Sequence, residues 1–120
     1  MKRTVTIFCL ITVAFVANAQ TKFYDGTWKE AYKEAEKQNK LLFVDCYTDW
    51  CYWCKVAEKN TFPDAEVGKI LNDNFISVQT DMERGEGIDL GMKYRVMGYP
   101  TYLVLLLNSG GNSSYKYLFV

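Results

Sequence analysis

The chain of 120 residues has room for one domain, and its composition (49% hydrophobic, 16% aromatic and 23% charged) is that of a globular protein rather than a disordered or fibrous one. Fourteen basic and fourteen acidic residues give a net charge of zero, which excludes a dedicated nucleic-acid-binding protein because such proteins carry an excess of positive charge. The absence of histidine excludes Ser/His and Cys/His catalytic arrangements and histidine-based metal sites.

Residues 1–19 are predicted to be a signal peptide. The basic dipeptide Lys2-Arg3 precedes an apolar run over residues 5–17, and Ala17-Asn18-Ala19 supplies the small residues of a cleavage site. The apolar run is shorter than the ~20 residues of a membrane span, which disfavours an anchor. Cleavage would leave residues 20–120 as one domain that is secreted or lies in the periplasm of a Gram-negative bacterium.

The first half of this domain predicts helices that alternate with strands. Thr27 and Glu30 form a capping-box pattern, which predicts a helix that ends at about Gln38. Residues 41–47 are apolar and rich in strand-forming side chains, so we expect a buried strand there. A second helix is expected over residues 51–59.

The second half predicts shorter elements and a closing hairpin. The expected elements are a helix over residues 65–71, a turn at 72–74, a strand over 75–80, a helix over 88–94, a strand over 101–107, a hairpin turn at 109–112 and a strand over 115–120. This order predicts an α/β fold with a mixed sheet.

The most informative stretch is Cys51-Tyr52-Trp53-Cys54, at the predicted start of a helix. Cys51 would lie among unpaired backbone N–H groups at the positive end of the helix dipole, and Lys55 adds a cation one turn later, so we expect a lowered pKa for the Cys51 thiol. Cys54 lies further into the helix and is expected to be less exposed. We therefore expect Cys51 to attack a disulfide and Cys54 to resolve the mixed disulfide. The bulky Tyr52 and Trp53 would offer an apolar surface to a partner, although desolvation by them would oppose thiolate formation.

The cysteine count leaves other interpretations open. Cleavage of the signal peptide would leave Cys46, Cys51 and Cys54, so one thiol must stay free or pair between molecules. The pair Cys51 and Cys54 could form a purely structural disulfide. It could also be half of a zinc site, although zinc needs four ligands and the chain offers neither a second pair nor histidine. A soft-metal site, for example for Cu(I), would use Cys46 as well. We favour redox chemistry.

Two segments carry a family resemblance. Asp49-Trp50-Cys51-Tyr52-Trp53-Cys54-Lys55 resembles the active-site segment of the thioredoxin superfamily, and Gly98-Tyr99-Pro100-Thr101 resembles its cis-proline segment. Within the superfamily, residues 22–107 are most similar to the periplasmic C-terminal domain of the bacterial transmembrane disulfide reductor and to small secreted proteins of the same build. The resemblance implies a thioredoxin-like fold, a mixed sheet flanked by helices. Family members continue after the hairpin with a helix that is missing from this sequence, which leaves open a truncation of the domain, an end altered by a frameshift, or completion of the domain by a partner.

The resemblance also implies roles for single residues. Trp50 would pack beside the sulfur atoms. Pro100 would follow a cis peptide bond, and Tyr99 before it would offer backbone hydrogen bonds to a bound peptide. Together with Tyr52 and Trp53, these residues form the expected substrate-binding surface.

Asp45, six residues before Cys51, matches the buried acid of the family. A carboxyl group in such an apolar run should have a raised pKa, and it could take a proton from Cys54 through water in the second step. The alternative is that Asp45 caps a loop at the end of the strand.

Two further positions depart from the family pattern. Strand alternation points Cys46 to the face opposite Asp45, so we expect a buried core residue there, with a regulatory or intermolecular thiol as the alternative. Ser77 stands where some thioredoxins have a lysine near the buried acid, so tuning by that cation would be absent.

Together these observations predict an extracytoplasmic thiol–disulfide oxidoreductase. We expect a disulfide reductase that works through Cys51 and Cys54 on protein disulfides, takes electrons from a membrane protein and needs neither a metal nor an organic cofactor. The reduction potential sets the direction of exchange, so oxidase or isomerase activity remains an alternative. A second hypothesis is a binding module that holds peptides or a soft metal in the same groove without turnover.

Overall fold

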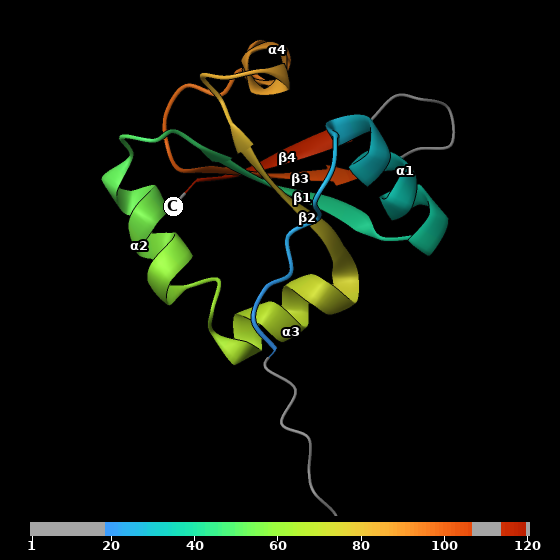
Figure 1. The fold of residues 1–120 in the computed structure, drawn as a ribbon. Coiled ribbons are helices and arrows are strands. Elements are labelled where there is room, and N and C mark those ends of the chain that lie inside the picture. Colours follow the sequence, from blue (N-terminus) through green and yellow to red (C-terminus); the bar gives the residue numbers. More distant parts are fainter. Residues whose placement is uncertain (1–18, 107–113, 120) are drawn as a thin grey trace, which may run out of the picture.

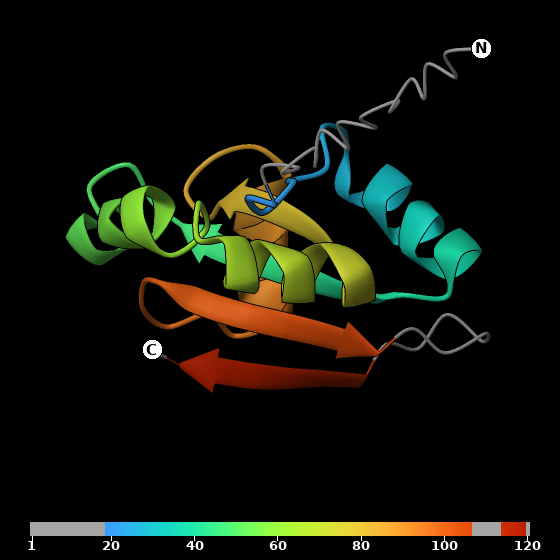
Figure 2. The same cartoon turned by 90° about the horizontal axis from the view of Figure 1, so that it is seen from below.

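The computed structural model describes residues 19–106 and 114–119. A sheet lies at the centre of this structure, and a group of buried side chains packs on each of its two faces. The helices are α1 (Trp28–Gln38), α2 (Tyr52–Asn60), α3 (Ala65–Asn74) and α4 (Glu86–Lys93). The strands are β1 (Leu41–Tyr47), β2 (Phe75–Asp81), β3 (Thr101–Leu106) and β4 (Ser114–Phe119). Helices α1 and α4 cover one face of the sheet, and α2 and α3 cover the other (Figures 1 and 2).

The sheet has the order β2-β1-β3-β4. Strand β2 runs parallel to β1, whereas β3 is antiparallel to both β1 and β4. The expectation of an α/β fold with a mixed sheet is therefore confirmed. Strand β1 is an inner strand, and the segment that follows it leads directly into α2, so the Cys51–Cys54 stretch lies at the end of a buried strand.

Alternation along β1 divides its side chains between the two faces. Leu42, Val44 and Cys46 join the core under α1 and α4, while Phe43 joins the core under α2 and α3. Asp45 shares the face of Phe43, and it lines a cavity together with residues of α2. The opposite placement of Asp45 and Cys46 confirms the expectation from strand alternation.

The predicted bounds of α1 and β1 are confirmed, because both elements are specified by local signals. The Thr27 hydroxyl accepts a hydrogen bond from the backbone N–H of Glu30 at 3.3 Å, and the Glu30 carboxylate accepts one from the backbone N–H of Thr27 at 2.8 Å. This capping box satisfies two N–H groups that the first turn would otherwise leave unpaired.

Helix α3 is longer than predicted, and the turn expected at residues 72–74 is wrong. Lys69 and Asp73 form an i,i+4 ion pair at 2.7 Å, and the side chain of Asn74 donates to the carbonyl of Ile70 at 2.8 Å. These polar side chains interact with groups of the same helix. The helix therefore continues three residues beyond its predicted end, to Asn74.

Helix α4 begins at Glu86, two residues earlier than predicted, and ends at Lys93. The carboxylate of Glu86 accepts a hydrogen bond from the backbone N–H of Trp28 at 2.8 Å, and an acidic residue in a first turn also interacts favourably with the helix dipole. This contact joins the starts of α1 and α4 on one face of the sheet.

The segment before α1 is tied to α3. The side chain of Asn72 accepts from the backbone N–H of Lys22 at 2.9 Å and donates to the carbonyl of Gln20 at 3.0 Å. The backbone N–H of Thr21 donates to the carbonyl of Phe62 at 2.8 Å. Residues 1–18 of the expected signal peptide and the expected hairpin turn at 109–112 lie outside the described residues. Within the described part of the chain, no helix has the length and apolar character needed to cross a membrane.

Candidate active site

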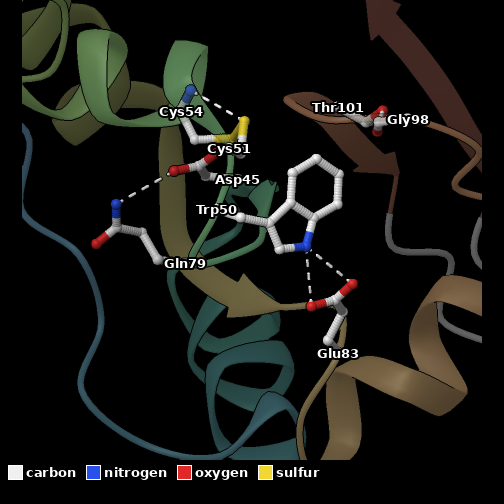
Figure 3. Close-up of a disulfide and its surroundings, with 8 residues drawn as sticks. All are labelled: Asp45, Trp50, Cys51, Cys54, Gln79, Glu83, Gly98 and Thr101. Carbon is white, nitrogen blue, oxygen red and sulfur yellow. Dashed lines mark hydrogen bonds between the residues drawn. A yellow bond between two sulfur atoms is a disulfide. The ribbon is translucent and has the colours of Figure 1, made fainter.

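Cys51 and Cys54 form a disulfide at the N-terminus of α2, with their Cα atoms 5.3 Å apart (Figure 3). Cys51 is the N-cap residue of the helix, and its Sγ accepts a hydrogen bond from the backbone N–H of Cys54 at 3.1 Å. The spacing of three residues lets the N-cap side chain turn back over the first helical turn. In the reduced form, the same N–H group and the helix dipole can stabilise a thiolate at Cys51.

Both sulfur-bearing residues are buried in this oxidised form. Cys51 is 3% exposed and Cys54 is 6% exposed. The expectation that Cys54 is the less exposed of the two is therefore wrong. The reason is the N-cap geometry, which folds the Cys51 side chain back toward the Cys54 N–H instead of leaving it in solvent.

Asp45 is the buried acid of the site. It is 2% exposed, and its Oδ2 accepts a hydrogen bond from Nε2 of Gln79 at 3.1 Å (Figure 3). The pKa of Asp45 is raised to about 6, chiefly because burial disfavours the charged form; the hydrogen bond from Gln79 works in the opposite direction, and the negative charge of Glu58 adds to the rise. The partner is a strand side chain rather than a loop N–H, so the geometry does not favour the loop-capping alternative.

A cavity of about 420 Å³ connects the acid with the second cysteine. Its lining residues are Asp45, Tyr47, Thr48, Asp49, Cys54, Lys55, Glu58 and Gln79. Lys55 and Glu58 bring opposite charges from α2 to this cavity. Because Asp45 and Cys54 open into one space, a proton can pass between them through solvent.

Strand register selects the neighbour of Asp45 on β2. Gln79 stands opposite Asp45 in the parallel pairing, whereas Ser77 stands opposite Phe43. The neutral amide of Gln79 is thus the β2 side chain that contacts the buried acid in this protein. The sequence analysis missed Gln79, since the register of two parallel strands cannot be inferred from either strand alone.

Two aromatic pairs flank the sulfur atoms. Trp50, 66% exposed, contacts the ring of Tyr99 edge-on at a centroid distance of 5.8 Å. Tyr52 and Trp53 on α2 form a second edge-on pair at 5.1 Å, and both are more than half exposed. The Tyr99–Pro100 peptide bond is cis.

Glu83 fixes the orientation of Trp50. The indole Nε1 of Trp50 donates to both carboxylate oxygens of Glu83, at 3.0 and 3.1 Å (Figure 3). Glu83 lies two residues after the end of β2 at Asp81, so the loop after this parallel strand reaches the active-site segment. Sequence analysis gave no signal for this contact, because the two residues are brought together only by the crossover between β1 and β2.

Cys46 lies away from this chemistry. It is fully buried in the core under α1 and α4, and burial raises the pKa of its thiol to about 12, with Asp45 contributing in the same direction. This placement confirms the expected buried core residue. In the described part of the chain, no group of three or more Cys, Asp or Glu side chains lies close enough to hold a metal ion.

Comparison with known proteins gives a family match and curated relatives. The family model Thioredox_DsbH, described as "Protein of unknown function, DUF255", matches residues 15–102. The thiol:disulfide interchange protein DsbD of Colwellia psychrerythraea is 39% identical over 87 residues, which is 70% of this chain and 14% of that protein. The chain spans only about a tenth of the length of the curated relatives it matches, from 8% to 14%.

Solved structures agree with this match. A putative disulphide-isomerase from Bacteroides thetaiotaomicron is 44% identical, with a TM-score of 0.64 over 72% of this chain and 71% of that one. A thioredoxin from Thermus thermophilus has a TM-score of 0.73 at 24% identity, over 83% of this chain and 75% of that one. At that identity the second likeness concerns the fold alone.

Proposed function

The chain belongs to the Thioredox_DsbH family of the thioredoxin superfamily, and from this premise we propose that Cys51 and Cys54 are the redox centre of a thiol–disulfide oxidoreductase. One observation carries the proposal. The Cys51–Cys54 disulfide caps α2 beside a cavity that also contains a buried carboxyl group with a raised pKa. A purely structural disulfide would need neither the cavity nor the acid.

The proposed reaction transfers two electrons from the cysteine pair to a protein disulfide. In the first step, the Cys51 thiolate attacks one substrate sulfur, and the other substrate sulfur leaves as a thiolate. In the second step, Cys54 gives its proton to Asp45 and attacks Sγ of Cys51. The substrate leaves with its second sulfur reduced, and the Cys51–Cys54 disulfide remains. A dithiol donor then reduces the pair for the next turnover.

Asp45 is the proposed proton acceptor of the second step. A carboxyl group with a pKa of about 6 is mostly ionised at neutral pH, yet it binds a proton more readily than an exposed aspartate does. Its position on the shared cavity supports this role, since a proton from Cys54 does not have to reach bulk solvent.

Three exposed aromatic residues and the partly buried Tyr99 form the proposed substrate surface. Trp50 and Tyr99 contact each other on one side of the disulfide, and Tyr52 and Trp53 extend from α2. Large, rigid aromatic side chains are enriched where proteins bind partners. The backbone of Tyr99, next to Pro100, would hydrogen-bond an extended substrate segment.

We propose that the enzyme works outside the cytoplasm as a disulfide reductase with a membrane protein as its dithiol donor. The location rests on the predicted signal peptide at residues 1–19. The direction rests on the resemblance of residues 22–107 to the periplasmic domain of the transmembrane disulfide reductor, and the likeness to DsbD, named for thiol:disulfide interchange, supports the exchange chemistry itself. The 44% identity to a putative disulphide-isomerase supports isomerase activity as a second candidate.

Trapping tests the proposal. The Cys54→Ser variant of the full chain should capture a disulfide-containing substrate protein as a covalent mixed disulfide at Cys51, seen by mass spectrometry without reductant. Cys51→Ser is the matched control and should capture none. Equal capture by the two variants, or none by either, would contradict the proposal.

The direction of disulfide exchange is tested separately, by measuring the reduction potential of the Cys51–Cys54 pair after equilibration with glutathione buffers. A potential near about −270 mV supports a reductase, and one near about −120 mV an oxidant. An isomerase needs only the attacking thiol. Reshuffling of a scrambled substrate that survives in Cys54→Ser would therefore support the isomerase candidate instead.

A further inference from the structure

Helix α4 ends in a backbone conformation that normally favours glycine. The backbone N–H of Val96 donates to the carbonyl of Gly91 at 2.9 Å. The backbone N–H of Arg95 donates to the carbonyl of Met92 at 3.3 Å. These two bonds form the Schellman motif of a helix C-terminus, and Arg95 holds its left-handed position with a φ of 52°. Glycine would adopt this conformation without strain, so the strain points to a use for the arginine side chain.

Arg95 lines an open, largely apolar groove of about 510 Å³. Among the described residues that line this groove, Arg95 alone is charged. Every methionine of the chain except Met1 contributes to the groove. Methionine side chains are flexible and polarizable, so a surface rich in them adapts to apolar side chains of different shapes. The residues that carry the argument below are Met82, Ile88, Met92, Arg95, Met97 and Tyr99.

The apolar side chains of this groove are exposed to solvent. Met97 is 89% exposed, Met92 is 69% exposed and Ile88 is 48% exposed. Single exposed apolar residues are normal on a protein surface, but here three of them line one groove. Exposed apolar side chains that gather in this way mark an interaction site.

The guanidinium of Arg95 has no carboxylate partner in the part of the chain that the structure describes, where the ion pairs involve other basic residues. The neighbouring Lys93 lies over the ring of Tyr94, with its Nζ 5.2 Å from the ring centroid, and adds a second positive charge at this end of α4. Arginine binds carboxylates with a fork of N–H donors. An unpaired guanidinium beside exposed methionines is therefore complementary to a segment that carries a carboxylate next to an apolar side chain.

The groove is continuous with the proposed substrate surface. Tyr99 lines the groove, and its ring contacts the ring of Trp50 edge-on at a centroid distance of 5.8 Å. Trp50 directly precedes Cys51 in the chain. A segment that lies across Tyr99 can thus present its disulfide to Cys51 and place a neighbouring side chain in the groove.

We propose that this groove selects the substrate, a protein disulfide flanked by an apolar residue and an acidic residue. The apolar side chain enters the groove among the methionines, and the acidic side chain pairs with Arg95. This inference rests on the proposed function and names its substrate class. Because the methionines accept apolar side chains of several shapes, the charge of Arg95 supplies the discrimination, in favour of acidic and against basic flanking residues.

Capture of matched peptides by the full chain tests this proposal. In the Cys54→Ser background, cysteine peptides activated as 2-thiopyridyl disulfides transfer to Cys51 and release 2-thiopyridone, whose absorbance gives the rate. The peptides carry Leu-Glu, Leu-Lys or Ser-Glu at several distances from the cysteine, because an extended chain spans about 3.3 Å per residue. Each rate is divided by the rate of the same peptide with glutathione. At the best distance, the Leu-Glu peptide should react at least roughly fivefold faster than the Leu-Lys peptide.

Substitutions in the groove should change this preference in a defined way. Arg95→Glu should invert it, whereas Lys33→Glu, which makes the same charge change on the exposed surface of α1, should keep it. Arg95→Gly should abolish the preference and yet unfold at a higher urea concentration, because glycine fits the left-handed position. Met92→Ser and Met97→Ser should each reduce the advantage of the Leu-Glu peptide over the Ser-Glu peptide by roughly threefold and retain the charge preference.

Three results would overturn the proposal. The first is an equal charge preference in the chain with Arg95, in Arg95→Gly and in Arg95→Glu, and the second is the same inversion in Lys33→Glu. The third is a dimer in analytical ultracentrifugation that Met97→Ser dissociates, since the groove would then hold a second copy of the chain. Absence of any capture by Cys54→Ser would show instead that the proposed function itself fails, and the substrate class would fall with it.

Discussion

One buried carboxyl group, that of Asp45, links the chemistry of the site to the stability of the domain. Its pKa is about 6 in the folded protein, compared with 3.8 for an ordinary aspartate in solvent. Between these two pH values the folded state binds more protons than the unfolded state. Stability therefore falls as the pH rises through this window, and the penalty for the charged form is fully present above about pH 6. A shift of this size corresponds to roughly 3 kcal/mol at neutral pH.

Replacement of Asp45 by asparagine should remove this penalty. The amide keeps an oxygen that can accept from Gln79 but cannot ionise. At pH 7.5 we expect Asp45→Asn to unfold at a higher urea concentration than the wild type. Its free energy of unfolding should be larger by up to about 3 kcal/mol, and this difference should disappear toward pH 4. Urea titrations of the oxidised proteins at the two pH values measure it. The exposed Asp25→Asn serves as control, and a gain from Asp45→Asn that does not depend on pH would contradict the assignment.

At the scale of single elements, α3 and α4 each contain a glycine whose surroundings differ. A Cβ atom at Gly68 in α3 would overlap the backbone of Ala19 and Gln20, because the segment before α1 lies directly against this helix. A Cβ atom at Gly91 in α4 would meet only the Sδ of Met82, at 3.4 Å, which is an ordinary contact. The missing side chain at Gly68 thus lets the segment before α1 pack closely against α3. At Gly91 glycine has no such role, and it only lowers the stability of the helix relative to alanine.

The two glycines should respond to alanine with opposite signs. Gly91→Ala should stabilise the protein by up to about 1 kcal/mol, because alanine is the better helix former. Gly68→Ala should destabilise it, since the segment held by Asn72 must move away from α3. Urea unfolding of both variants measures the difference, and faster amide exchange at Thr21 and Lys22 would locate the loss in Gly68→Ala. Two changes of the same sign would be inconsistent with this account.

At the scale of the whole molecule, the two cores share the inner strands of the sheet. On β3, Leu103 and Leu105 pack into the core under α1 and α4, while Tyr102 packs into the core under α2 and α3. Each inner strand therefore contributes side chains to both cores. A change on one face weakens the strand that supports the other face, so we expect the domain to unfold as one unit.

Truncation of Leu105 tests this coupling. Leu105 is fully buried, and Leu105→Ala should lower the free energy of unfolding by about 2–5 kcal/mol. The neighbouring Leu106 is 46% exposed, and Leu106→Ala should change it by less than about 1 kcal/mol. Circular dichroism and tryptophan fluorescence should report one common transition in both variants. Two separate transitions in Leu105→Ala would mean that the two layers unfold independently.

Short-range patterns determined much of this protein. The capping box at Thr27 and the apolar run of β1 gave the bounds of their elements, because hydrogen bonds within one turn and alternation along one strand depend only on neighbouring residues. The same reasoning predicted the burial of Asp45 and the opposite placement of Cys46. The three-residue spacing of Cys51 and Cys54 predicted a pair at the start of a helix.

Only the tertiary structure decided what surrounds that pair. The register of β1 and β2 placed Gln79 rather than Ser77 beside Asp45, and the crossover between them brought Glu83 to Trp50. These contacts join residues more than thirty positions apart, and a shift of one residue in register would exchange the faces of a strand. Local sequence carries the periodicity of each element. The relative placement of elements depends on how both cores pack at once, so the cavity shared by Asp45, Thr48 and Cys54 exists only in the folded chain.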